Sequence, residues 1–150
     1  MKNLKGIGGW LILVAISVVA TPFLVLFRLL IFPRVFSNEI FPLMSTGLKT
    51  LAISEALFFG VMFFVTIYIA WLFFSKDRRF PIWLIGVYLT LITFNIIYFV
   101  SGTILIPDQA LAWPFDILAQ MLGAAIWIPY LLKSKRVRLT FIEYRHFQYL

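Results

Sequence analysis

The sequence predicts an all-α, polytopic membrane protein: a bundle of four transmembrane helices with the N- and C-termini in the cytoplasm. Three observations predict this class. Hydrophobic residues make up 63% of the 150 residues and charged residues only 13%, compared with about 25% charged residues in soluble domains. The mean hydropathy is +1.00. The chain also contains long charge-free runs, close to the roughly 20 apolar residues that a helix needs to cross a bilayer.

Four such runs predict four helices in a single domain. The runs are Gly6–Phe27, Ala56–Ser75, Phe80–Pro107 and Ile117–Leu132. With flanking apolar residues, we expect helices at about 7–30, 51–74, 81–102 and 113–132, followed by a basic, aromatic tail over 133–150. Pro33, Asn38, Pro42 and Gly47 indicate a loop between the first two helices.

The first run has two possible interpretations, a cleaved export signal or a retained helix. A signal peptide has an apolar region of about 7–15 residues that ends at a small-residue cleavage site. Val18-Val19-Ala20 offers such a site, but the apolar run continues to Phe27. We therefore expect the segment to remain as a transmembrane helix.

The distribution of positive charge predicts the orientation, because Lys and Arg are enriched in cytoplasmic loops. With the N-terminus inside, three basic residues lie outside: Arg28, Arg34 and Lys49. The cytoplasmic side then holds Lys2, Lys5, Lys76, Arg78, Arg79, Lys133, Lys135, Arg136, Arg138 and Arg145. The basic residues 133, 135, 136 and 138 are expected to attract anionic lipids at the inner surface.

Polar residues within the spans are the candidate functional site, because ionisable groups in a membrane are costly and often functional. We expect a polar pocket near the periplasmic side, in which Arg28 pairs with either Glu55 or Asp116. The full candidate set is Arg28, Glu55, Asn95, Asp116 and Gln120. The alternative is structural: the two acids would lie in the first turns of their helices, where carboxylates complement the helix macrodipole.

Small residues predict where helices approach closely, since they let backbones come together in a membrane. The candidate packing residues are Gly6, Gly9, Ala56, Gly60, Ala119 and Gly123. In the tail, Phe141, Tyr144 and Phe147 recur every three residues, which favours a short helix at the inner membrane surface over a docking segment for a partner.

The residue content argues against catalysis. The chain has no cysteine and one histidine, His146, so thiolate metal sites and a bis-histidine haem site within one chain are excluded. We expect no enzyme activity, no metal, no cofactor and no nucleic-acid partner. A two-carboxylate site at Glu55 and Asp116 remains formally open, but no residue pattern specifies a substrate.

Two stretches carry a family resemblance. "GIGGWLIL" (Gly6–Leu13) and "IPYLLKSKRVRLTF" (Ile128–Phe141) resemble a bacterial inner-membrane family catalogued as domain of unknown function 2569. The resemblance covers nearly the whole chain. It implies a small, multi-pass protein of the bacterial inner membrane with four helices, and it implies no reaction, ligand or catalytic residue.

Two functions of different classes follow. The first is a non-enzymatic accessory or interaction subunit of a membrane assembly, supported by the small-residue stripes. The second is an oligomeric carrier of a small solute or ion that uses the polar pocket. A partner protein favours the first, whereas a homo-oligomer without a partner favours the second.

Overall fold

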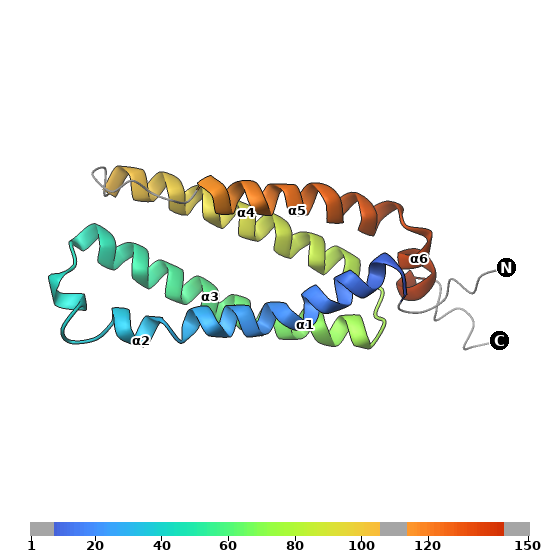
Figure 1. Cartoon of the computed structure of the whole chain (residues 1–150), viewed down its shortest axis with the longest axis horizontal. Coiled ribbons are helices and arrows are strands. Elements are labelled where there is room, and N and C mark those ends of the chain that lie inside the picture. Colours follow the sequence, from blue (N-terminus) through green and yellow to red (C-terminus); the bar gives the residue numbers. More distant parts are fainter. Residues whose placement is uncertain (1–7, 106–113, 143–150) are drawn as a thin grey trace.

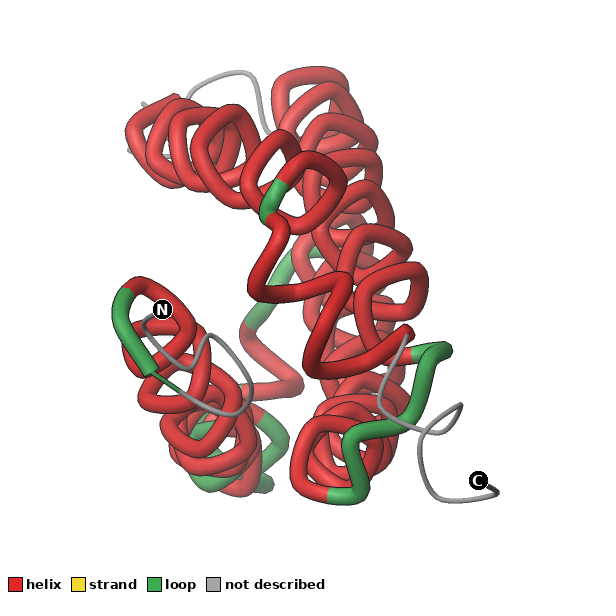
Figure 2. The backbone as a smooth tube through the Cα atoms, turned by 90° about the vertical axis from the view of Figure 1, so that its right-hand side faces the viewer, coloured by secondary structure: helices red, strands yellow, loops and turns green. Residues whose placement is uncertain are grey.

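The regular elements of the described residues are all helices, connected by short turns. The computed structural model describes residues 8–105 and 114–142, with side chains from residue 117 onward in the second range. Its helices are α1 (Trp10–Leu29), α2 (Phe32–Val35), α3 (Thr46–Phe74), α4 (Phe80–Leu105), α5 (Pro114–Lys133) and α6 (Lys135–Val137), with a short 3₁₀ turn η1 (Phe41–Leu43) and a π turn η2 (Arg138–Ile142). No strand occurs among the described residues (Figure 2).

Three segments are long and apolar enough to cross a membrane by themselves. They are Trp10–Val35, which joins α1 and α2, then α3 and α4. A fourth span is counted only if Ile117–Lys133 and Lys135–Ile142 are taken together, and these two parts meet at an angle of 57°. The structure thus supports a multi-pass helical membrane protein with three or four spans.

The second long helix begins earlier than the predicted start near residue 51. The side-chain oxygen of Ser45 accepts a hydrogen bond from the backbone N–H of Leu48 at 3.3 Å, which caps α3 before Thr46. The loop expected after the first helix is also partly helical, because it contains α2 and η1.

The long helices pack as successive neighbours. α1 packs against α3, α3 against α4, and α4 against α5. Figure 1 shows α1 with α3 along the lower half of the molecule and α4 with α5 along the upper half. At one end of the molecule lie the start of α1, the α3–α4 turn (residues 75–79) and the α6–η2 segment (Figure 1). We call this the basic end.

The hydrophobic core is concentrated toward the basic end. Phe73, Phe80 and Phe141 are each at most 2% exposed, and their rings contact one another with centroid separations of 4.7–5.6 Å. Leu11 of α1 and Leu131 of α5 belong to the same buried cluster. The α3–α4 turn and the segment after α5 are therefore fastened to each other by aromatic packing.

The prediction of an interfacial tail is wrong for Phe141. This ring packs against Phe73 of α3 and Phe80 of α4 instead of facing the membrane surface. The chain bends by 57° after α5, where Ser134 caps α6. Tyr144 and Phe147 lie outside the described residues.

The two glycines before α1 meet the segment after α5. A Cβ added at Gly8 would collide with the guanidinium of Arg136. A Cβ added at Gly9 would lie 3.6–3.7 Å from atoms of the same guanidinium. Gly9 has φ 57° and ψ −137°, a conformation that is essentially restricted to glycine. The two stretches that carry the family resemblance therefore touch. Gly6 lies outside the described residues.

We predict that Phe141→Ala lowers the free energy of unfolding by about 3–5 kcal/mol, the usual cost of removing a buried aromatic ring. Unfolding in mixed micelles titrated with a denaturing detergent measures this change. Ile142→Ala is the matched control, because its side chain is 55% exposed. Equal losses in the two variants would contradict the packing role of Phe141.

We also predict that Gly9→Ala costs about 1–3 kcal/mol of stability, because alanine is strained at this backbone conformation. Gly8→Ala should cost less, since the obstructing atom is the mobile end of Arg136. In an Arg136→Ala background the Gly8→Ala change should cost nothing further. The same unfolding assay tests both, and a larger cost at Gly8 than at Gly9 is the contrary result.

Candidate functional site

A polar cluster links α1, α3 and α4 near the end opposite the basic end. Arg28 Nη1 lies 3.7 Å from Glu55 Oε1, and the Tyr98 hydroxyl donates a hydrogen bond to Glu55 Oε2 at 2.8 Å. The structure thus pairs Arg28 with Glu55, one of the two partners that the sequence left open. One carboxylate joins three helices.

The macrodipole explanation fails for Glu55. It required Glu55 to lie in the first turn of its helix, but α3 starts at Thr46 and has no acidic residue in that turn. The macrodipole acts mainly over the first turn, so the contacts with Arg28 and Tyr98 explain the carboxylate. Arg28 does lie in the last turn of α1, where a cation is favoured. The Asp116 side chain lies outside the described residues.

Burial differs strongly within this cluster. The Arg28 side chain is 52% exposed and that of Glu55 only 23%, while Tyr98 is 7% exposed. The Arg28 guanidinium also lies 5.1 Å from the ring centroid of Phe59. An ion pair with one half-exposed partner contributes about 0–1 kcal/mol, so the more buried tyrosine contact is the stronger tie.

A second polar pair joins α4 to α5. The Asn95 side-chain amide donates to Gln120 Oε1 at 3.1 Å and to the backbone oxygen of Leu91 at 2.8 Å. Asn95 lies one helical turn from Tyr98, so the two groups stand next to each other on α4. Four of the five predicted pocket residues are therefore brought into contacts between neighbouring helices.

A small cavity of about 70 Å³ lies between α1, α3 and α4, and hydroxyl groups from all three helices line it. Ser17, Thr21 and Thr66 each donate their hydroxyl hydrogen to a carbonyl of their own helix. The polar candidates predicted from the sequence did not include Thr66. Its signal is its spacing of eleven residues from Glu55, about three turns, which puts both on one face of α3.

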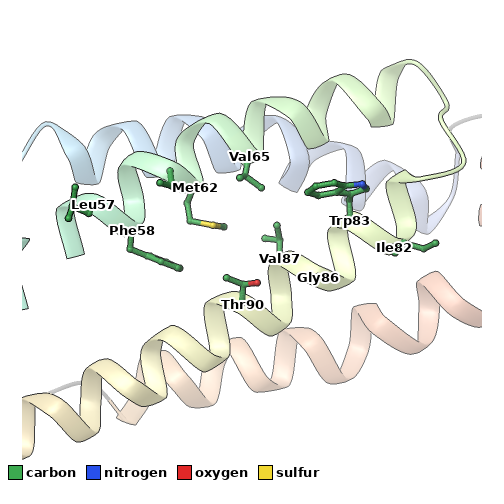
Figure 3. Close-up of a pocket in the computed structure, with 10 residues that line it drawn as sticks. Leu57, Phe58, Met62, Val65, Ile82, Trp83, Gly86, Val87 and Thr90 are labelled. Atoms are coloured by element: carbon green, nitrogen blue, oxygen red, sulfur yellow. The ribbon is translucent and has the colours of Figure 1, made fainter. Parts of the chain in front are cut away.

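A larger cavity forms an apolar groove of about 690 Å³ between α3 and α4, shown in Figure 3. The lining residues recur with the same helical spacing on both helices, but the sequence did not reveal the groove, because spacing defines one face of each helix and not which faces lie opposite each other. The lining residues are Leu57, Phe58, Val61, Met62, Val65, Ile82, Trp83, Gly86, Val87 and Thr90.

Two of the predicted packing glycines have open space beside them. A Cβ added at Gly60 or Gly123 would meet nothing within 4 Å, so neither glycine is packed against a neighbouring helix. Ala119 is exposed and Ala56 is partly buried. Of the predicted packing glycines, Gly9 is the one that the structure places near a distant segment.

The predicted basic group lies at the basic end, as the positions of α5 and α6 require (Figure 1). Lys133, Lys135 and Arg138 are exposed, and Arg136 is partly buried beside Gly8. Among the described residues, no group of three or more His, Cys, Asp or Glu side chains is arranged to hold a metal ion.

Together these features define a class: a small, multi-pass helical membrane protein whose polar residues link its helices. The comparison with known protein families is made on the sequence. A model for a family of proteins of unknown function, DUF2569, matches residues 4–142. The chain belongs to this family, which confirms the resemblance seen in its two motifs. No curated protein and no solved structure matches the chain.

We predict that Tyr98→Phe lowers stability by about 0.6–2 kcal/mol, because the hydrogen bond of this buried tyrosine to a partly buried carboxylate is lost. Arg28→Gln should cost less than about 1 kcal/mol, because the ion pair is half-exposed. A double-mutant cycle with Glu55→Gln, read by detergent unfolding, separates the two couplings. A stronger coupling of Glu55 to Arg28 than to Tyr98 would reverse this ranking.

Proposed function

We propose that the protein is a non-enzymatic accessory subunit of a membrane assembly, which binds a helix of a partner protein. The carrying observation is the open space at Gly60 and Gly123, each in the middle of a long apolar helix. Glycine destabilises a helix by about 1 kcal/mol relative to alanine. In membranes this cost is offset where a second helix packs closely against the small residue.

The α5 face is the more specific of the two candidate contacts. Ala119 and Gly123 are four residues apart, the spacing that brings small residues onto one side of a membrane helix and permits close helix pairing. Their neighbours Leu118, Leu122 and Ile126 are 55–66% exposed. A partner helix that packs here would therefore meet a shallow track of small residues between large apolar ones.

The polar residues support this structural role over the carrier alternative. Glu55 is engaged by Arg28 and Tyr98, and Asn95 by Gln120. Neither of the two cavities described above is lined by any of these residues. Their contacts are those expected of groups that hold membrane helices together.

We place the protein in the bacterial inner membrane with its basic end in the cytoplasm. Support comes from the shared position of the α3–α4 turn and the α5–α6 segment, which contain most of the described basic residues. Positive charge on one side of the helices is the main determinant of orientation. Reporter fusions at the C-terminus test this placement, and an external C-terminus would refute it.

The test of the partner is native mass spectrometry after gentle extraction from the source membrane. We expect a defined complex with another membrane protein, and we expect Gly123→Leu or Gly60→Leu to weaken it. Inserting a bulky side chain into a packed interface costs about 1–3 kcal/mol, or roughly 5- to 150-fold in affinity.

Gly86→Leu is the matched control, because Gly86 is also a glycine within a long helix and has nothing within 4 Å of an added Cβ. It lies in the α3–α4 groove, away from the proposed contacts, so the complex should survive. A homo-oligomer without a partner, unaffected by Gly60 and Gly123 variants, would support the carrier instead.

A further inference from the structure

The apolar groove between α3 and α4 is open to the surroundings and lies on the flank of the molecule. Its walls are aliphatic and aromatic, and Thr90 and Trp83 are the lining residues whose side chains have a polar atom. Figure 3 shows Gly86 at a turn of α4 where no side chain projects. In a bilayer such a groove would be filled by an apolar group.

The length of the groove matches one leaflet. At one end, Trp83 packs edge-on against Tyr68 with ring centroids 5.3 Å apart, so this end lies level with Tyr68. The other end is at Leu57, eleven residues away along α3. At 1.5 Å per residue this distance is about 16 Å, close to half of the roughly 30 Å hydrocarbon core.

Positive charge lies just beyond the end of the groove at Trp83. Arg78 and Arg79 are exposed in the α3–α4 turn, and Arg79 precedes Trp83 by about one helical turn, roughly 6 Å. The nearby carboxylate of Asp77 accepts a hydrogen bond from the backbone N–H of Arg79 at 2.8 Å. Neither guanidinium forms an ion pair with a described acid, so the turn keeps a net positive charge.

We propose that the groove and this turn form a binding site for an anionic glycerophospholipid. One acyl chain lies along the groove, and the phosphate meets Arg78 and Arg79. The apolar walls and the one-leaflet length of the groove fit an acyl chain. The two arginines beyond the Trp83 end, which form no ion pair with a described acid, fit the phosphate. Neither Gly60 nor Gly123 lines the groove, and the site goes beyond the accessory role.

Native mass spectrometry in a mild detergent tests the site with two added lipids, phosphatidylglycerol and phosphatidylcholine. We expect the wild type to retain phosphatidylglycerol preferentially. Each of Arg78→Gln and Arg79→Gln should weaken phosphatidylglycerol binding about fivefold, the effect of one basic residue near an anionic lipid surface, and should leave phosphatidylcholine binding unchanged. Gly86→Leu should weaken both lipids, because the new side chain fills the groove.

Gly123→Leu is the matched control and should retain both lipids. A photoreactive acyl chain on phosphatidylglycerol should label residues along the groove. Unchanged lipid retention in Gly86→Leu, or labelling spread evenly over the exposed faces of all helices, would overturn the proposal. Those results would leave the partner complex and its Gly60 and Gly123 variants unaffected, so the two proposals fail separately.

Discussion

The fold depends on one constraint: lipid tails are as apolar as the side chains of these helices, so burial of apolar area alone does not bring the helices together. Shape complementarity and polar pairing must do so. The carboxylate of Glu55 shows the second mechanism, because it contacts α1 through Arg28 and α4 through Tyr98. Asn95 and Gln120 extend the connection to α5. Water is absent from the hydrocarbon core, so such groups are stable there only when they meet each other.

The two ends of the molecule use different mechanisms. At the basic end, the rings of Phe73, Phe80 and Phe141 are buried together, and the segment after α5 closes over the α3–α4 turn. Toward the opposite end, the half-exposed Arg28 and the more buried Tyr98 both contact Glu55, and the rings of Phe58 and Phe94 stack nearby. Aromatic packing depends on many contacts of fixed geometry, whereas an exposed ion pair is weak and screened by salt. The aromatic contacts at the basic end are therefore more deeply buried than the Arg28–Glu55 pair toward the other end.

The fold class was predictable because hydrophobic length and charge placement are local properties of the sequence. The all-helical architecture and the apolar spans follow from them. The pairing of Arg28 with Glu55 was predicted as one of two options, since helical phase gives the face of a residue but not which neighbour lies opposite. The position of Phe141 was predicted wrongly, because its burial depends on tertiary contacts with Phe73 and Phe80 that a local sequence pattern does not show. The groove was not predictable, since its shape depends on how two antiparallel helices cross.

The three open glycines show how one residue type takes different roles on different surfaces. Gly60 and Gly123 lie outside the groove, and Gly86 lies within it. A partner helix is a rigid cylinder about 10 Å wide, so it needs a flat track of small residues such as Ala119 and Gly123. An acyl chain is thinner and flexible, so it can enter a groove walled by Phe58 and Trp83. With Arg78 and Arg79 beyond one end of that groove, charge and shape together favour a lipid there and a protein on the α5 face. Neither Ala119 nor Gly123 lines the groove, so the lipid proposed for the groove would leave the α5 face open to the proposed partner helix.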